Sequence, residues 1–154
     1  MDIFIFMKVS TLPAVSTHAA IPLIRLMVGA VFLSEGIQKF LLPAEVGAGR
    51  FAKIGLPEPE LLAAFVGGSE IICGALVLVG FMTRLTVLPL LAIMFTALWT
   101  TKLPILTNKG FWKMAHEART DFSVVMGSLF LLLVGAGAFS VDAWMRQRRD
   151  AADS

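Results

Sequence analysis

Two acidic residues, Glu35 and Glu70, fall inside segments that are otherwise apolar enough to cross a lipid bilayer. Glu35 precedes Lys39 by four residues, which is the favourable order for an ion pair on one face of a helix. Glu70 has no basic residue within one turn of its own helix. It must therefore pair across helices, keep its proton or meet water. Ionisable groups at membrane depth are costly, and they mark candidate sites for protons or polar ligands.

The composition predicts a membrane protein, because 57% of the 154 residues are hydrophobic and the mean hydropathy is +0.82. The 13 basic and 11 acidic residues leave a net charge of only +2, which gives no reason to expect nucleic acid as a partner. A bilayer core of about 30 Å needs about 20 apolar helical residues per crossing. We therefore predict an all-α integral membrane protein, a four-transmembrane-helix bundle with its charges facing inward. Its spans are expected at residues 20–42, 60–81, 84–102 and 120–142.

One domain accounts for the whole chain. We expect a loosely ordered N-terminal segment at 1–19, the four-helix membrane domain at 20–145, and a basic-then-acidic C-terminal tail at 146–154. Basic residues are divided almost equally between the two faces, so the positive-inside rule does not decide the orientation. The cluster WMRQRR follows the fourth span. It favours both termini in the cytoplasm, because basic clusters meet anionic lipid there.

Counting 1.5 Å per helical residue places Glu35 and Glu70 at similar depths below the end of the bundle that carries the long loops. We predict a polar intramembrane cluster at this end, a candidate quinone or proton site, formed by Glu35, Lys39, Glu70, Lys102, His116, Glu117, Arg119 and Asp121. A separate charged set is expected toward the opposite face, formed by Arg25, Arg84, Asp142 and Arg146. Each residue also has a structural reading. Glu35 could pair with Lys39 alone, and Arg25 and Arg84 could be interfacial or snorkelling residues.

Two packing relationships follow from the four-span map. Arg84 should lie near Asp142 or Arg146 at the face that carries both termini. Small residues on the first two spans should line helix contacts, because close backbone approach replaces the hydrophobic drive that lipid cannot supply. The residues expected there are Ala30, Ser34, Gly67 and Gly74.

Several cofactor chemistries lack their usual residues. Cys73 is the single cysteine, so an intrachain disulfide and paired-cysteine redox chemistry are excluded. His18 and His116 fall on opposite predicted faces, and they do not form the usual pair of axial haem ligands. No zinc-ligand spacing is present either. We therefore predict no metal site and no covalently bound cofactor.

The chain resembles the DoxX family of small four-helix membrane proteins over residues 20–145. The resemblance rests on RLMVGAVFLSEGIQKFLLP at 25–43, GLPEPELLAAFVGGSEIICGALVLVGFMTRL at 55–85, HEARTDFSVVMGSLFLLLVGAG at 116–137 and SVDAW at 140–144. The order of the glycines, the intramembrane glutamate, the Thr-Arg pair and HEARTD makes it specific. One departure is that many members carry histidine where this chain has Glu35, so a role for that histidine is not carried over.

The resemblance implies a multi-pass protein of the bacterial inner membrane, associated with quinone-linked respiration, sulfur oxidation or oxidative-stress complexes. It implies no uniform activity, since one fold hosts many functions. Our first interpretation is a small quinone-associated subunit or partner of a soluble or membrane redox complex. The absence of flavin, haem or iron–sulfur motifs favours a subunit over a whole enzyme. The alternative is a non-catalytic membrane scaffold or assembly factor. A small-solute permease is disfavoured, because the sequence has no inverted repeat.

Overall fold

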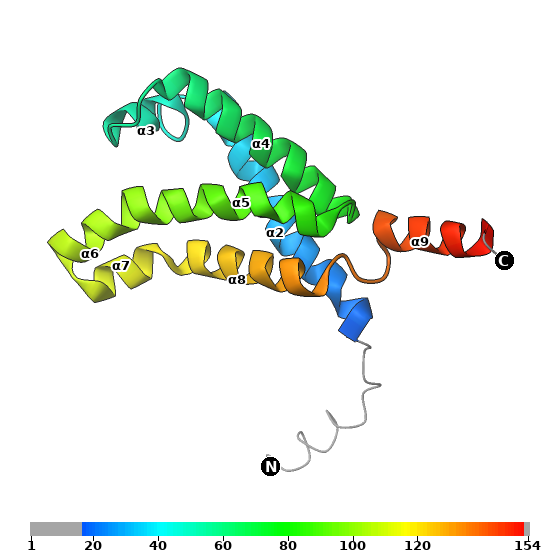
Figure 1. Ribbon diagram of the computed structural model, residues 1–154. Helices are drawn as coiled ribbons and strands as arrows, with labels where there is room; N and C mark the ends of the chain where they lie inside the picture. The colour runs from blue at the N-terminus through cyan, green and yellow to red at the C-terminus, as the bar shows by residue number, and fades with distance from the viewer. Residues whose placement is uncertain (1–16, 153–154) are drawn as a thin grey trace, which may run out of the picture.

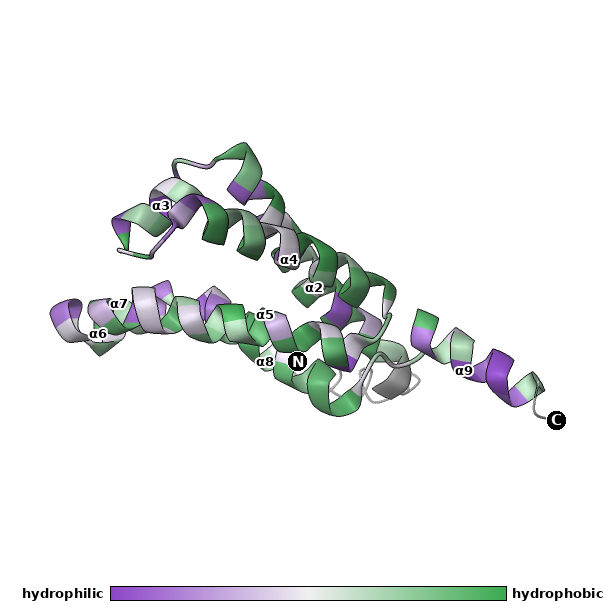
Figure 2. Ribbon diagram, turned by 45° about the horizontal axis from the view of Figure 1, so that its top comes forward, coloured by the Kyte–Doolittle hydropathy of each residue, from purple (hydrophilic) through white to green (hydrophobic). Residues whose placement is uncertain are grey.

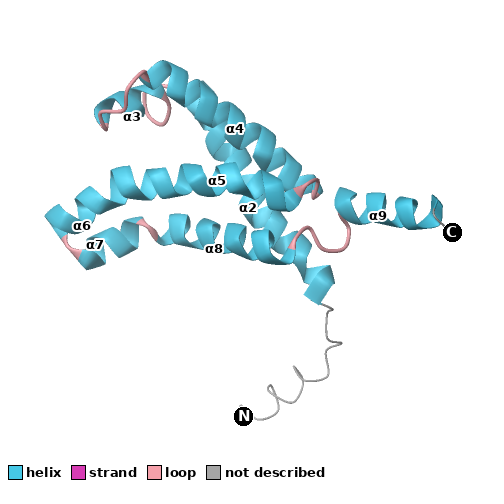
Figure 3. Cartoon of the chain, viewed as in Figure 1, coloured by secondary structure: helices cyan, strands magenta, loops and turns pink. Residues whose placement is uncertain are grey.

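The computed structural model describes residues 17–152, and in that range the chain consists of helices joined by turns and loops (Figures 1 and 3). The N-terminal segment predicted at 1–19 lies outside the described residues except for residues 17–19. In chain order the elements are α2 (Thr17–Leu41), α3 (Ala48–Lys53), α4 (Pro59–Val79), α5 (Thr83–Ala97), the π-helix η1 (Leu98–Lys102), α6 (Leu103–Lys109), α7 (Phe111–Glu117), α8 (Arg119–Val134) and α9 (Val141–Ala152).

Three helical stretches within the described residues are long and apolar enough to cross a membrane. They run over Ala19–Leu41, Pro59–Val79 and Thr83–Lys109. Their outward faces carry large apolar side chains, such as Leu61 at 69% and Phe65 at 70% exposure. Figure 2 shows apolar colouring along most of α4, α5 and α8. Such a surface suits lipid better than water.

The third helical stretch is longer than predicted. The expected span ended at residue 102, but α5 continues through η1 and α6 to Lys109 without a break. The π-helix at Leu98–Lys102 lies within this stretch and adds one wider turn to it.

The predicted fourth span was wrong at its C-terminal end. Helix α8 has 16 residues and ends at Val134, not at residue 142. Gly135, Gly137 and Phe139 follow with φ values of 90°, 70° and 54°, which a right-handed helix cannot contain. Residues 141–152 then form α9, so the tail predicted at 146–154 begins inside a helix. At about 24 Å, α8 is shorter than a bilayer core, and the four-span count stays a prediction.

The helices pack as two pairs. Helix α2 lies along α4 and α5 lies along α8, while α4 contacts α5 and α2 contacts α8. The pairs share a buried core that is formed by Ile21, Val28, Phe32, Val77, Val87, Leu90, Val124 and Leu131. Figures 1 and 2 show the pairs together near the start of α9 and diverging toward α3, α6 and α7. The end with the longer connections is therefore the open end of the fold.

Glycines bring α2 and α4 into backbone contact at two levels. A Cβ atom added to Gly36 would lie 2.7 Å from the carbonyl oxygen of Gly67, and one added to Gly74 would lie 3.0 Å from that of Gly29. In each helix the two glycines are seven residues apart, so they share one face over two turns. The prediction for Gly67 and Gly74 is confirmed. It was wrong for Ala30 and Ser34, which are exposed, because Gly29 and Gly36 form the contact face of α2.

Candidate functional site

An ion pair links α2 and α4 inside the membrane-spanning part of the fold. Nζ of Lys39 lies 2.6 Å from Oε2 of Glu70, and it donates a hydrogen bond to that oxygen. The two side chains are 9% and 4% exposed. Glu70 is thus one of the few charged residues that are almost fully enclosed, and its partner comes from a different helix.

The close glycine contact explains why these two side chains meet. Lys39 follows Gly36 by three residues, and Glu70 follows Gly67 by three residues. Residues three apart lie on the same face of a helix. The close approach of the two backbones at Gly36 and Gly67 therefore places one charged side chain of each helix beside the other. The sequence-based alternative that Glu70 pairs across helices holds in the structure.

Glu35 does not take part in that ion pair. Its side chain is exposed, and Nζ of Lys39 approaches only the Glu35 backbone oxygen, at 3.5 Å. The proposed local pair between the side chains of Glu35 and Lys39 is therefore not formed. Glu35 follows the buried residues Val28 and Phe32 by seven and three positions, so it continues their face along α2. Its carboxylate still interacts electrostatically with Glu70.

A second ion pair lies in the α5–α8 pair. Nζ of Lys102 is 3.0 Å from Oδ2 of Asp121 and donates a hydrogen bond to the backbone oxygen of Glu117 at 3.0 Å. Lys102 is the last residue of η1, and Asp121 lies in the first turn of α8. The two side chains are 16% and 27% exposed, so this pair is more accessible than the first.

The other members of the predicted polar cluster lie at the surface. His116, Glu117 and Arg119 are exposed. Glu117 pairs with Lys113 at 3.1 Å, and the hydrogen bond from Lys113 holds the pKa of the Glu117 carboxyl below its ordinary value. Arg119 donates to the backbone oxygen of His116. This arrangement fixes the short turn between α7 and α8.

The predicted single cluster is therefore divided between the two helix pairs. In the part of the chain that the structure describes, no hydrogen bond or ion pair joins Lys39 or Glu70 to Lys102 or Asp121. The reason is the divergence of the helix pairs at this end (Figure 1). Counting residues along each helix places these side chains at one depth in the membrane. It does not say which helices are separated at that depth.

At the opposite end, a buried arginine joins three parts of the fold. Arg25 is 5% exposed. Its guanidinium donates to the backbone oxygens of Val77 at 3.1 Å and Leu78 at 2.6 Å, at the end of α4. It also donates to Ala136 and Phe139, both at 3.1 Å, in the loop after α8. The snorkelling interpretation of Arg25 was wrong, because the unpaired carbonyls at two chain bends supply its partners inside the protein.

Asp142, Arg84 and Arg146 lie at the same end. The Asp142 carboxylate accepts hydrogen bonds from the backbone N–H groups of Met82 at 2.8 Å and Thr83 at 3.3 Å. It thereby caps the start of α5 from a distant part of the chain. Nη2 of Arg84 donates to the backbone oxygen of Leu133 at 2.9 Å. The opposite-face charged set thus surrounds one junction, in which the expected proximity of Arg84, Asp142 and Arg146 is seen.

Lys113 is the polar partner that the sequence reasoning missed. It precedes Glu117 by four residues, a spacing that could have revealed the pair. The carbonyl partners of Arg25 had a weaker signal, namely the glycines at 80, 135 and 137 that mark the bends. Among the described residues, no three His, Cys, Asp or Glu side chains converge as metal ligands.

Comparison with known proteins places the chain in a family. The DoxX family profile matches residues 20–103. The uncharacterized membrane protein Rv3486 of Mycobacterium tuberculosis is 48% identical over an alignment of 134 residues, and the match covers 83% of this chain and 82% of that protein. No solved structure matches the chain. The family match covers α2 to η1, including Lys39 and Glu70, and the relative extends the similarity over most of the sequence. The chain belongs to the DoxX family of membrane proteins.

Proposed function

We propose that this protein is a small quinone-associated subunit or partner of a redox or oxidative-stress complex, and that the Lys39–Glu70 pair is its quinone site. The observation that carries the proposal is the buried ion pair at the open end of the fold, with the exposed carboxylate of Glu35 beside it. A charged pair that served only to hold α2 against α4 would not need a second carboxylate at that level, since the glycine contacts already join these helices.

The donor set fits a quinone ring. Lys39 has three N–H donors. Glu70 uses one of them, and within residues 17–152 only a 3.5 Å contact to the Glu35 backbone oxygen competes for another. A donor therefore remains for a quinone carbonyl oxygen. Glu70 orients the ammonium group, and Glu35 is placed to exchange protons with the polar surface. A bound quinone would supply two-electron, two-proton redox chemistry. Apolar side chains along the diverging helices suit its isoprenoid tail.

We also propose how the chain spans the membrane. Helix α8, preceded by α7, completes a four-span bundle in the inner membrane of a bacterium, with both termini in the cytoplasm. The packing of α8 against α2 and α5 supports the fourth span. The exposed arginines of α9, at 146, 148 and 149, support a cytoplasmic C-terminus, because basic segments favour that side. A partner subunit, soluble or in the membrane, supplies or receives the electrons.

The test is the quinone content of gently purified protein, measured by solvent extraction and mass spectrometry. The key variant is the double change Lys39→Met/Glu70→Leu, because replacing both partners of a buried pair with apolar residues is often tolerated. We expect the wild type to retain quinone and the double variant to retain about tenfold less, given the worth of a hydrogen bond from a charged donor. Lys53→Met in exposed α3 is the control, and it should leave the quinone content unchanged.

Equal quinone content in the wild type and a folded double variant would refute the quinone site. The second candidate, a scaffold or assembly factor, is favoured by α9, which projects beyond the helix pairs and exposes its arginines (Figure 1). Identifying the proteins that copurify with the wild type and with the double variant separates the two. A scaffold would keep its partner and its cellular activity in the double variant, whereas a quinone-dependent subunit would keep the partner and lose the activity.

A further inference from the structure

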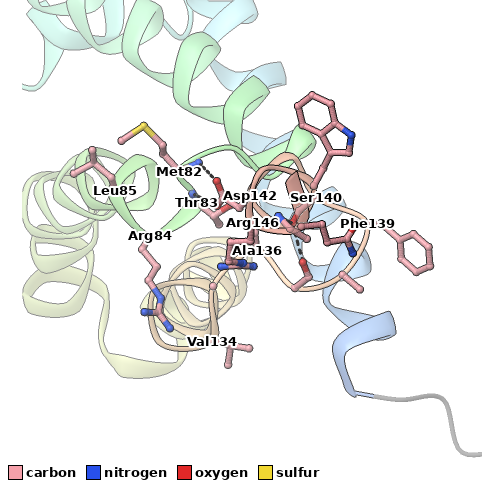
Figure 4. Close-up of a pocket in the computed structure, with 16 residues that line it drawn as sticks. Met82, Thr83, Arg84, Leu85, Val134, Ala136, Phe139, Ser140, Asp142 and Arg146 are labelled. Carbon is pink, nitrogen blue, oxygen red and sulfur yellow. Dashed lines mark hydrogen bonds between the residues drawn. The ribbon is translucent and has the colours of Figure 1, made fainter. Parts of the chain in front are cut away.

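A pocket of about 810 Å³ opens at the end of the fold opposite the Lys39–Glu70 pair. It lies between the start of α5, the loop after α8 and the first turns of α9 (Figure 4). Among its lining residues are Arg84, Leu85, Val134, Phe139, Trp144 and Arg146. Nothing in the proposed quinone site uses this pocket, since the two lie at different ends of α2 and α4.

Two arginines from different helices line the pocket. Arg84 uses one N–H for the backbone oxygen of Leu133, and its other donors have no partner among the residues that the structure describes. Gly135 lies beside it, and a Cβ there would be 3.4 Å from Nε of Arg84. The glycine thus keeps the guanidinium uncovered. Arg146 is exposed, and within the described residues it has no hydrogen bond or ion pair. Arg146 and the free donors of Arg84 can therefore bind a ligand.

Among the described residues that line the pocket, the one carboxylate already has hydrogen-bond partners. Asp142 accepts the N–H groups of Met82 and Thr83, and it also interacts electrostatically with the buried Arg25. It therefore does not neutralise Arg84 or Arg146 by direct contact in the described residues. With two arginines and one carboxylate in its lining, the pocket keeps a positive charge. An anionic group is the natural complement.

Most of the remaining lining is apolar, although Thr83, Ser140 and Gln147 also contribute to it. Phe139 is 81% exposed and Trp144 is 52% exposed. Leu133, whose oxygen binds Arg84, is 76% exposed. The pocket also lies at the end of α8 and at the start of the Thr83–Lys109 stretch, which is the level of lipid headgroups if these helices cross the bilayer. A ligand that matches both features has an anionic head and an apolar tail.

We propose that this pocket binds the phosphate group of an anionic phospholipid. The phosphate lies between the guanidinium groups of Arg84 and Arg146, which match its oxygens in charge and in hydrogen-bonding geometry. An acyl chain lies against Leu85, Val134 and the neighbouring lipid-facing side chains. Free inorganic phosphate would satisfy the arginines but would leave the apolar rim without a partner.

Native mass spectrometry of the full chain, released from micelles that contain phosphatidylglycerol or phosphatidylcholine, tests the proposal. We expect the wild type to retain phosphatidylglycerol in preference to phosphatidylcholine. Arg146→Gln should weaken retention of phosphatidylglycerol about tenfold, since each charge-assisted contact is worth that much or more. Arg149→Gln is the matched control. It makes the same charge change on the same helix, but residue 149 does not line the pocket.

Arg84→Lys gives an independent measurement. The lysine keeps the charge and loses the planar fork, so retention should fall severalfold while the protein stays folded, as judged by circular dichroism. Equal loss for Arg146→Gln and Arg149→Gln would overturn the proposal, because it would mean diffuse attraction to α9. Equal retention of the two lipids would also overturn it. If millimolar inorganic phosphate displaced bound phosphatidylglycerol as strongly as added phosphatidylglycerol does, the pocket would be a site for free anions and not for a lipid.

Discussion

Nζ of Lys39 lies 2.6 Å from Oε2 of Glu70, so two residues 31 positions apart form an almost fully enclosed ion pair between α2 and α4. The pair lies outside the shared core, whose buried residues on these two helices are Ile21, Val28, Phe32 and Val77. A charged pair at this place holds the α2–α4 pair together at its open end. It also leaves one lysine donor unused, which is what a polar ligand would require.

Single changes at this pair should destabilise the protein more than the double change does. Lys39→Met or Glu70→Gln leaves one buried partner without its counterpart, at a cost of about 3–5 kcal/mol. The double variant Lys39→Met/Glu70→Leu leaves no buried charge and should lose much less. Thermal unfolding of the purified variants in micelles measures the difference. A double variant no more stable than the worse single variant would show that the pair does not act as a coupled unit.

The exposed pair of α7 provides the contrast. Lys113→Met/Glu117→Leu should leave the unfolding temperature unchanged, because solvent-exposed ion pairs often contribute nothing measurable. A loss comparable to that of the buried pair would mean that α7 has a structural role that its exposure does not indicate.

The Lys113 hydrogen bond also predicts a pH effect. It lowers the pKa of Glu117 in the folded protein. The unfolded chain therefore binds this proton more readily. The small stabilisation is complete above the ordinary glutamate pKa and is lost as the pH falls through the lowered value. Lys113→Gln should raise the pKa of Glu117 toward its ordinary value, as measured by NMR titration of the carboxyl carbon. Lys109→Gln, a nearby exposed charge change, should leave it unchanged.

The glycine contacts predict that stability depends on which glycine of α4 is replaced by alanine. Gly74→Ala would place a Cβ 2.8 Å from the backbone nitrogen of Leu33, so α2 and α4 would have to separate, at about 1–3 kcal/mol. Gly68→Ala is the control, since a Cβ there meets nothing within 4 Å. It should be neutral or slightly stabilising, because alanine favours helix over glycine. Thermal unfolding of both variants in the same micelles measures the difference in stability. Equal losses of stability would contradict the close contact of α2 and α4 at Gly74.

Much of this fold is readable from the sequence, and the failures have a common cause. Hydropathy and length locate α2, α4 and most of α5, because lipid imposes one strong constraint on every residue of a span. Charge at membrane depth singles out Glu70 and Lys39 for the same reason. The end of α8 was missed because glycine does not interrupt an apolar segment in a hydropathy pattern. The helix ends through the positive φ values of Gly135 and Gly137, which the pattern does not contain.

The placement of the charged residues was harder to predict. Counting residues along each helix places Glu35, Glu70 and Asp121 toward the same end of the bundle. It does not give the angle between the helix pairs. That angle depends on which small residues face one another, and glycines occur on several faces of these helices. Arg25 was misplaced for a similar reason. Its partners are backbone oxygens at bends of α4 and of the α8–α9 loop, and the glycines at 80, 135 and 137 indicate the bends but not the partner of these oxygens.

The bend after α8 should depend on Arg25. Its guanidinium bonds four backbone oxygens, those of Val77, Leu78, Ala136 and Phe139. Arg25→Gln would leave several of these buried oxygens without donors, at about 1–3 kcal/mol for each one left unsatisfied. We expect a large fall in unfolding temperature. Arg25→Lys should recover only part of it, since one ammonium group cannot reach oxygens on two sides as a planar fork does.

Hydrogen exchange distinguishes a loosened junction from general unfolding. The amide of Asp142 donates to Gly80 and the amide of Met82 donates to Asp142, so both depend on the bend that Arg25 holds. In Arg25→Lys they should exchange faster than in the wild type, while core amides of α4 and α8 keep their protection. Arg149→Gln, an exposed arginine outside the junction, should change neither set. Unchanged protection at Asp142 and Met82 in Arg25→Lys would show that the bend forms without the guanidinium. The positive φ values at residues 135, 137 and 139 would then be sufficient to place α9 against the start of α5.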